Sequence, residues 1–384
     1  MKVLNVNHLL DPQTGGGTAE RTFQISRFLA KAGVVTTVLA LDIGLGKARA
    51  EELDKVKVVT LPCVHQRFFV PWSPAGLIDK LVADADIVHL SGHWTILNVL
   101  VYRSCRRQGK PFAFCPAGAL TPFGRSLKLK RAYDTLVGRE LARSAAVCVA
   151  ITEQERGDFA AYGITPERMA VIPNGIDPAQ YAGADEPQAE RNIRERLNIG
   201  AEPYIFFLGR LNTIKGPDLL LEAFSQVLER FPEFHLVFAG PDGGLQPSLM
   251  ESAKKSHLQG RIHFPGYLAN ADKAAALSAA TLLAIPSRRE AMSIVVLEAG
   301  ICGTPALFTD TCGLEEIAAL GAGTMVEVSA AALAAGLTGL LADPSFMNTA
   351  ATRLKALVRD KYLWEMQAAR YVALYEKVLS GARK

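Results

Sequence analysis

One local pattern occurs twice in this chain, about half a chain apart, and it limits the possible folds more than any other feature. In residues 3–41 the apolar run VLNVNHL is followed by a glycine-rich turn, an amphipathic segment and a second apolar run, VVTTVLAL. In residues 204–240 the order is YIFFLGR, LNTIKG, the helical PDLLLEAFSQVLERFP and HLVFAG. Strands that alternate with helices form parallel sheets covered by helices. We therefore expect an α/β fold with two Rossmann-like, doubly wound parallel sheets.

Further short apolar runs that end in turn residues fill each half. These runs are ADIVHLSG, PFAFCPAG, AAVCVAIT and MAVIPNG in the first half and IHFPG, TLLAIPS, TPALFTD and GTMVEV in the second. Residues 183–203 are charged and contain no strand pattern, so we expect a linker there. The helical spacing of YLWEMQAARYVALYEKVL predicts a final amphipathic helix. The expected parts are a first domain at 1–182, a second domain at 196–361 and a helix at 362–384.

The composition excludes several classes of protein. A formal charge of +4 over 384 residues is too small to predict nucleic-acid binding. Six cysteines without a CxxC pair or zinc-like spacing predict buried, reduced thiols and a cytoplasmic location. The first residues are too polar for a signal peptide, and the longest apolar stretch, 330–342, is too short to span a membrane. We expect a soluble chain.

Positive charge is concentrated in residues 103–143. This segment contains ten lysines and arginines against two acidic residues, a local excess of about +8. Phe123, Leu127 and Leu129 lie among the charges. Basic residues interleaved with apolar ones bind anionic lipid headgroups. The segment therefore predicts peripheral contact with a membrane, and a solvated pair of helices is an equally good interpretation.

Two glutamates bracket an apolar run in SRREAMSIVVLEAG. The preceding strand, TLLAIPS, brings them to the carboxyl edge of a sheet, where doubly wound proteins bind ligands. Ser293 is expected to cap a helix that begins at Ile294, with Glu290 before the cap and Glu298 about 7–8 Å beyond it. Free amides around Met292, Ser293 and Ile294 would form an anion site. The pattern fits a nucleotide-sugar, and two glutamates on a solvated helix face are the alternative.

A cationic loop follows the first strand of the second half. In FLGRLNTIKG, Arg210 comes directly after the strand and Lys215 five residues later. A guanidinium and an ammonium at a strand end suit a diphosphate. In FPGYL, Tyr267 follows another strand end, where it is a candidate to contact a nucleobase. Ordinary solvated loops are the alternative for both.

Two further candidate sites lie in the first half. Gly15, Gly16 and Gly17 allow backbone amides to approach a phosphate or a sugar closely. Because they are consecutive, they do not form the spaced GxGxxG of dinucleotide-binding proteins, which argues against an NAD enzyme. His93 follows the strand ADIVHL and is expected at the carboxyl edge of the sheet as a substrate contact. A structural role is the alternative for this histidine.

Taken together, these motifs resemble the group 1 enzymes of glycosyltransferase family 4, which are retaining and have the GT-B fold. The most specific element is the pair Glu290 and Glu298, separated by seven residues in PSRREAMSIVVLEAGICGTP. LGRLNTIKG, VIPNGID, FPGYL and TDTCGLEEI fit as well, and the resemblance covers essentially the whole chain. It implies two Rossmann-like domains with a cleft between them and a final helix that returns to the first domain.

The resemblance also implies residue roles. Arg210 and Lys215 would hold the diphosphate of a nucleotide-sugar, Glu290 the transferred sugar and Glu298 the ribose. No metal or cofactor is expected, because the two cations neutralise the leaving group, and front-face attack would retain the anomeric configuration. The candidate catalytic residues are Glu290, Arg210, Lys215 and His93. The candidate donor-binding residues are Gly15, Gly16, Gly17, Arg210, Lys215, Tyr267, Glu290, Met292, Ser293, Ile294 and Glu298.

The chain departs from the family pattern at three places. Many members have histidines at the positions of Ala117 and Ser91, so the sugar-contacting histidine cannot be transferred to this sequence and His93 is its substitute. The frequent EAFG is EAMS here, with Met292 and Ser293. This change keeps the amides and alters the sugar pocket.

The expected function is transfer of a sugar from GDP-mannose or a UDP-sugar to a glycan or a lipid-linked glycan. Such a hexosyltransferase would serve surface polysaccharide, lipopolysaccharide or glycolipid biosynthesis in the cytoplasm, at the inner face of the membrane. Two alternatives remain open. A GT-B-fold epimerase or hydrolase would need no acceptor, and a catalytically silent subunit would support another transferase.

Overall fold

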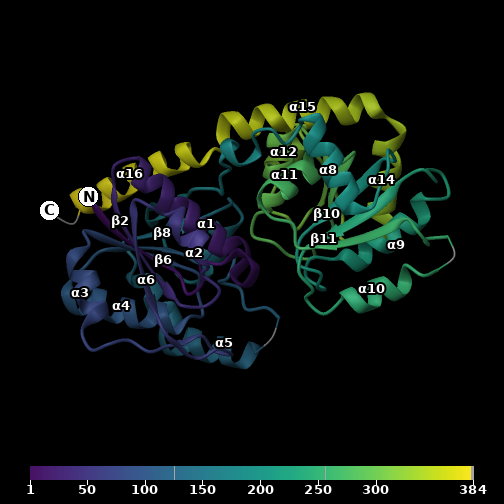
Figure 1. The fold of residues 1–384 in the computed structure, drawn as a ribbon. Helices are drawn as coiled ribbons and strands as arrows, with labels where there is room; N and C mark the ends of the chain where they lie inside the picture. The colour runs from purple at the N-terminus through teal and green to yellow at the C-terminus, as the bar shows by residue number, and fades with distance from the viewer. Residues whose placement is uncertain (125, 256, 382–384) are drawn as a thin grey trace. The chain divides into compact units, whose positions relative to one another are not determined.

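The computed structural model of the chain describes residues 1–124, 126–255 and 257–381. Contacts divide the chain into two units (Figure 1). Unit 1 comprises Met1–Asn174 and the chain from Trp364 onward, and unit 2 comprises Gly175–Leu363. The sequence places these boundaries at 182, 196 and 361 instead. The expected linker contains helix α8 (Pro187–Leu197), which packs inside unit 2.

Unit 1 contains a parallel sheet with the strand order β3-β2-β1-β6-β7-β8-β9. The chain fills one side of β1 first and then starts the other side with β6, which is the doubly wound arrangement. A short antiparallel pair, β4 and β5, lies outside this sheet. The strands are β1 (Lys2–Val6), β2 (Val35–Leu41), β3 (Val56–Leu61), β4 (Cys63–His65), β5 (Val70–Pro71), β6 (Ile87–Ser91), β7 (Phe112–Cys115), β8 (Val147–Ala150) and β9 (Met169–Val171).

Helices cover both faces of this sheet. Figure 1 shows α1, α2 and α16 along one face and α3, α4 and α6 along the other. The strands are buried from both sides and therefore read as continuous apolar runs, such as VCVA in β8. The helices are α1 (Pro12–Lys31), α2 (Lys47–Glu51), α3 (Leu77–Asp84), α4 (Ile96–Gln108), α5 (Leu127–Tyr133), the π-helical turn η1 (Asp134–Gly138), α6 (Arg139–Ser144), α7 (Glu155–Ala161), the 3₁₀ turn η2 (Pro166–Arg168) and α16 (Trp364–Gly381).

The final helix, α16, packs on α1 through buried polar contacts. Arg21 of α1 donates hydrogen bonds to the hydroxyl of Tyr371, to Asn174 Oδ1 and to the carbonyl of Ile172 (2.9 Å). Burying a guanidinium is costly unless its donors find partners. These contacts therefore fix the position of α16 within unit 1.

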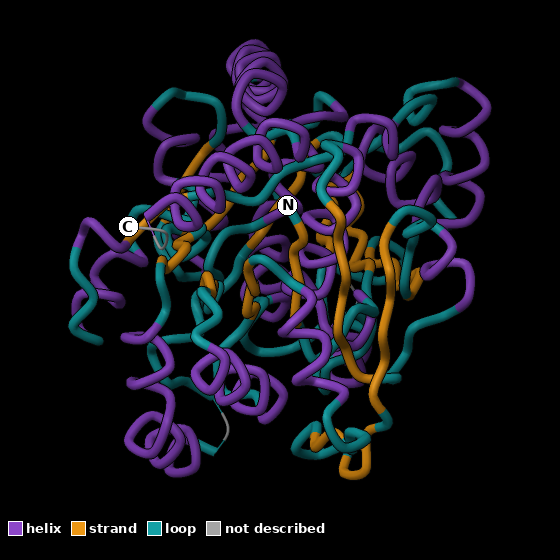
Figure 2. The backbone as a smooth tube through the Cα atoms, turned by 90° about the vertical axis from the view of Figure 1, so that its left-hand side faces the viewer, coloured by secondary structure: helices purple, strands orange, loops and turns teal. Residues whose placement is uncertain are grey.

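Unit 2 contains a parallel sheet with the strand order β12-β11-β10-β13-β14-β15. The chain adds β11 and β12 on one side of β10 and then β13, β14 and β15 on the other. This is the same doubly wound arrangement as in the first sheet. The helices α9, α10 and α14 pack on one face, over a core that includes Phe207, Phe224 and Leu337. Figure 2 shows strands in orange enclosed by helices in purple. The predicted fold class, two doubly wound parallel sheets, is confirmed.

The elements of unit 2 follow one another as alternating helices and strands. The strands are β10 (Tyr204–Leu208), β11 (His235–Ala239), β12 (Ile262–Gly266), β13 (Leu282–Ile285), β14 (Ala306–Thr309) and β15 (Thr324–Val326). The helices are the 3₁₀ turn η3 (Pro178–Tyr181), α8, α9 (Pro217–Val227), α10 (Gln246–Ser252), α11 (Asn270–Ser278), α12 (Ile294–Cys302), α13 (Glu315–Ala319), α14 (Ala330–Ala342) and α15 (Pro344–Lys361).

Within the described residues, no single helix is both long and apolar enough to cross a membrane. The helices α14 and α15 meet that criterion only as a pair, and they are bent by 100° at the break between them.

Candidate functional site

The candidate site of unit 2 lies where the strand order of its sheet reverses. The strands β10 and β13 are neighbours. The sheet continues from β10 to β11 and β12 on one side, and from β13 to β14 and β15 on the other. Loops at the carboxyl ends of such strands diverge and leave room for a ligand. Arg210 and Lys215 follow β10, Glu290 follows β13, and Tyr267 follows β12. These four side chains, predicted from three separate motifs, thus follow strands at one edge of the sheet.

Lys215 and Glu290 form an ion pair across this reversal point. The side chain of Glu290 is only 8% exposed, whereas that of Lys215 is 34% exposed. Ser287 Oγ donates a second hydrogen bond to Glu290 Oε1, at 2.9 Å. A carboxylate this buried needs such partners to remain charged. Lys215 is the more exposed partner, so its ammonium is the group of this pair that another anion can reach.

Two glycines allow the loops to approach closely enough for this pair. Gly216 has φ of +70°, and a Cβ there would lie 2.1 Å from the carbonyl oxygen of Pro286. Gly240 has φ of +140°, and a Cβ there would lie 2.0 Å from the carbonyl oxygen of Gly209. Only glycine combines that backbone conformation with that contact. Gly216 therefore holds the loop after β10 against the loop after β13.

The beginning of helix α12 differs from the prediction in one respect. Ser293 is the N-cap residue, with φ of −74° and ψ of 107°, but its side chain makes no capping hydrogen bond. Its hydroxyl is buried and has no partner among the described residues. Its amide donates to the carbonyl of Cys312 at 3.0 Å, so this amide is not one of the free donors. The amides of the first turn of α12 remain the candidate donors to an anion.

The side chains that flank Ser293 differ in burial. Met292 is buried, and Ile294 is half-buried at the first turn of α12. In the change from the frequent EAFG to EAMS, Met292 therefore keeps a buried apolar side chain at the position of the phenylalanine. The hydroxyl of Ser293 is the one polar group that this change adds.

Glu298 lies in the second turn of α12 and is buried. Its Oε1 atom accepts hydrogen bonds from the hydroxyl of Tyr181 (2.8 Å) and from the ammonium of Lys273 (2.6 Å). A buried carboxylate is stable only with such partners. The sequence did not identify Lys273 on α11 or Tyr181 on η3, because neither belongs to a recognisable motif.

The predicted glycine loop of unit 1 is part of a helix. Helix α1 extends over Pro12–Lys31, and only Gly16, with φ of +60° and ψ of −148°, interrupts its helical backbone. Asp11 caps this helix by accepting a hydrogen bond from the amide of Thr14 at 2.9 Å. A Cβ on Gly15 would lie 2.6 Å from the Cβ of Ala19. Gly15, Gly16 and Gly17 therefore form the kinked first turns of α1 rather than an open loop.

His93 follows β6 at the carboxyl edge of the sheet, as predicted, but it is buried. Its imidazole is completely buried, and its Nε2 lies 2.7 Å from Asp134 Oδ1. The rings of Trp94, Tyr133 and Tyr162 surround it. This enclosure favours the structural role that is the alternative for His93. Asp134, 41 residues further along the chain, had no signal in the sequence.

The other histidine of that motif, His89, is also buried. Its Nδ1 lies 2.8 Å from the hydroxyl of Tyr375 on α16. Burial, with a smaller effect of the nearby Arg21, lowers the pKa of His89 to about 3. His89 is therefore neutral and helps to hold α16. No group of three or more histidine, cysteine or acidic side chains suited to a metal occurs in the described part of the chain.

Two family models match this chain. The one described as glycosyl transferases group 1 matches residues 189–356, and the one described as glycosyltransferase family 4 matches residues 15–180. The first match contains the reversal point between β10 and β13, and the second contains β2 and β6. Together the two matches cover most of both units.

Individual proteins agree with the family models. The D-inositol 3-phosphate glycosyltransferase of Salinispora tropica is 27% identical over 347 residues, which are 81% of this chain and 70% of that protein. Its counterpart from Frankia alni is 28% identical over 351 residues, which are 83% of this chain and 84% of that protein. HepE of Anabaena in complex with UDP-glucose has a TM-score of 0.78 at 21% identity, covering 97% of this chain and 99% of that chain. The chain therefore belongs to glycosyltransferase family 4, the group 1 glycosyltransferases, and has the GT-B fold.

Proposed function

We propose that the chain is a retaining, metal-independent hexosyltransferase that takes its sugar from a nucleotide-sugar bound at the carboxyl edge of the unit 2 sheet. One observation carries the proposal: Lys215 and Glu290 meet where the strand order reverses. Arg210 lies on the same loop as Lys215, and α12 begins four residues after Glu290. Cations, helix amides and a carboxylate are the groups that a sugar diphosphate requires. HepE, which shares the fold, binds UDP-glucose. A UDP-sugar or GDP-mannose is the donor that we propose.

The charges suggest how the donor binds. A diphosphate that approaches Lys215 competes with Glu290 for the ammonium, and Arg210 supplies a second cation on the same loop. Glu290, once released, is free to accept hydrogen bonds from the hydroxyls of the sugar. Glu298, held by Tyr181 and Lys273, is the proposed acceptor for ribose hydroxyls, and Tyr267 the proposed contact of the base.

The proposed reaction exchanges one C–O bond for another on the same face of the sugar. The bond between the anomeric carbon and the diphosphate oxygen breaks, and a bond to the acceptor hydroxyl oxygen forms. The acceptor proton passes to an oxygen of the departing diphosphate. Because Arg210 and Lys215 stabilise that diphosphate, the step needs no metal ion and no protein nucleophile.

The proposed acceptor is a glycan or a lipid-linked glycan of a surface polysaccharide or glycolipid. The basic segment 103–143 belongs to unit 1 and supports an acceptor carried at an anionic membrane on the cytoplasmic side. Arg125, which that segment includes, lies outside the described residues. The curated relatives carry D-inositol 3-phosphate in their names, so this phosphorylated polyol belongs in any acceptor panel.

The test combines binding with product analysis. Thermal shifts with UDP, GDP and their sugars identify the donor, because binding to the native state raises the apparent melting temperature. The chosen donor is then incubated alone and with each acceptor, with and without a chelator, and the anomeric configuration of the product is read by NMR.

Each result of this test has a definite meaning. A retained configuration, full activity with the chelator and no turnover without acceptor support the proposal. Turnover of donor alone identifies an epimerase or hydrolase instead. If no nucleotide or nucleotide-sugar binds, the chain is a silent partner subunit and the proposal is wrong.

A further inference from the structure

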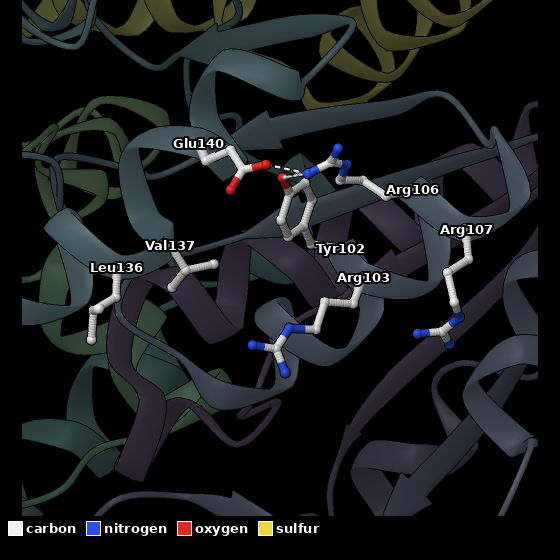
Figure 3. Close-up of a pocket in the computed structure, with 7 residues that line it drawn as sticks. All are labelled: Tyr102, Arg103, Arg106, Arg107, Leu136, Val137 and Glu140. Carbon is white, nitrogen blue, oxygen red and sulfur yellow. Dashed lines mark hydrogen bonds and ion pairs between the residues drawn. The ribbon is translucent and has the colours of Figure 1, made fainter.

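A pocket lies in unit 1, between helix α4 and the helical segment that contains η1 and α6. It has a volume of about 430 Å³. Figure 3 shows three arginines reaching into it from α4, opposite Leu136, Val137 and Glu140 from the other segment. The residues of the predicted glycosyltransfer site do not line it.

The three arginines give this pocket an excess of positive charge. Arg106 forms an ion pair with Glu140 and lies 3.4 Å from the hydroxyl of Tyr102. Arg107 forms an ion pair with Asp79 of α3 at 2.6 Å. For Arg103, the structure contains no ion pair with any residue in its described ranges. One guanidinium in the pocket is therefore available to an anion without breaking an existing pair.

One exposed apolar side chain lines the same pocket, and two more lie on the adjoining helix α5. Leu136, on η1, is 81% exposed, the highest fraction among the large hydrophobic side chains that the structure describes. Leu129 and Leu127, on the adjoining α5, are 58% and 41% exposed. Solvation of these side chains has a cost that burial in another apolar phase would remove. An exposed apolar rim beside a cationic pocket is the pattern of a surface that binds lipid.

We infer that this pocket binds the phosphate of an anionic phospholipid headgroup, with Leu136 inserted among the acyl chains. Charge complementarity selects the ligand: three guanidinium groups against two carboxylates leave one unit of positive charge, which one phosphodiester neutralises. The exposed leucines distinguish a bilayer from a soluble phosphate, which has no apolar part to cover them. The inference rests on the proposed function only for its purpose, which is to bring the enzyme to a lipid-linked acceptor.

Vesicle sedimentation without any nucleotide-sugar tests the site. The full chain is expected to bind vesicles of phosphatidylcholine with phosphatidylglycerol, to bind phosphatidylcholine alone weakly, and to dissociate at high salt. Arg103→Ala should weaken binding about fivefold, and Leu136→Asp at least about tenfold. Both positions are exposed, so unchanged circular dichroism and melting temperature are expected for the two variants.

Matched controls come from unit 2. Arg191 is an exposed arginine, and Leu320 is a leucine that is 53% exposed. Arg191→Ala and Leu320→Asp therefore make the same changes of charge and polarity as the two test variants, but outside the pocket. Both should sediment like the unaltered chain. Equal binding to the two vesicle types, or variants that bind no worse than these controls, would overturn the inference. Arg103-dependent binding of a labelled oligonucleotide, without vesicle binding, would overturn it in favour of nucleic acid.

Transfer to a water-soluble acceptor separates this inference from the proposed function. Arg103→Ala and Leu136→Asp should transfer sugar to that acceptor at the unaltered rate. If no transfer occurs but vesicle binding follows the expected pattern, the proposed function is wrong and the headgroup site stands. If transfer occurs and vesicle binding does not, the headgroup site is wrong and the proposed function stands.

Discussion

The ammonium of Lys215 contacts the carboxylate of Glu290, and the two side chains come from loops that follow neighbouring strands, β10 and β13. Each group compensates the charge of the other while no ligand is bound. The buried partner is the carboxylate, and the more exposed partner is the cation. We therefore expect an incoming anion to reach Lys215 before it reaches Glu290.

Replacement of Glu290 by glutamine tests the role of the carboxylate. Glutamine keeps an oxygen that accepts the hydrogen bond of Ser287 but lacks the charge. We expect kcat to fall about 100-fold or more, while the affinity for a nucleoside diphosphate does not decrease, because Lys215 loses its competitor. Glu251→Gln, an exposed glutamate of unit 2, is the control and should be fully active. Unchanged turnover of Glu290→Gln would remove Glu290 from the reaction.

Replacement of Arg210 by alanine tests the diphosphate site. The loss of one charge-assisted contact should lower the affinity for UDP or GDP at least about tenfold. Isothermal titration calorimetry measures this affinity directly. Arg210→Lys should restore only part of it, because an ammonium lacks the paired donors of a guanidinium. A dissociation constant equal to that of the unaltered chain would exclude Arg210 from the site.

Gly216→Ala tests the close approach of the two loops. A side chain at φ of +70° costs about 1–2 kcal/mol, and the clash with the carbonyl of Pro286 adds about 1–3 kcal/mol. Gly260, with φ of +78° and open space around it, provides the matched control. Chemical denaturation should show a larger loss of stability for Gly216→Ala than for Gly260→Ala. Equal losses would mean that the backbone conformation alone accounts for the effect.

The buried carboxyl of Glu155 should make the free energy of unfolding depend on pH. Burial raises the pKa of this carboxyl from 4.5 to about 7. Between these values the folded chain holds a proton that the unfolded chain has released, so the free energy of unfolding decreases as pH rises from about 4.5 to 7. The loss is on the order of 3 kcal/mol. Below this range both states are protonated, and above it both are ionised.

Glu155→Gln should remove that decrease. Unfolding by denaturant is measured at pH 5 and pH 8 for both chains, and the variant should gain stability relative to the unaltered chain at the higher pH. The buried His89 acts in both chains and cancels in the difference. Glu153→Gln is the control, because the side chain of Glu153 is 72% exposed. Parallel behaviour of Glu155→Gln and the unaltered chain would contradict the prediction.

The fold was predictable because parallel strands buried on both faces leave a strong signal. Runs such as LLAI in β13 and VCVA in β8 are apolar throughout and end at turn residues. The pair β4 and β5 carries no such signal, since its strands are short and partly exposed. The charged segment expected as a linker forms α8 because its few apolar residues, Ile193 and Leu197, are buried on one side.

The candidate site was predictable in part, and the division has a physical reason. Residues in the loops that follow strands, such as Arg210 and Glu290, are positioned by the topology of the sheet, which the sequence pattern reveals. Partners such as Lys273 of Glu298 depend on helix packing between distant segments, which leaves no periodic signal. Ser293 has the sequence of a cap, but tertiary contact with Cys312 takes its amide and its hydroxyl remains buried.

Because α16 packs on α1, unit 1 is assembled from two pieces of chain separated by the whole of unit 2. During synthesis, unit 2 can fold as soon as its own residues have left the ribosome. The hydrogen bond between Arg21 and Tyr371 in unit 1 can form only after the last helix has been translated. Unit 1 is thus the first unit to be translated and the last to be completed. A nascent chain that stops at residue 174 would lack the helix that covers α1.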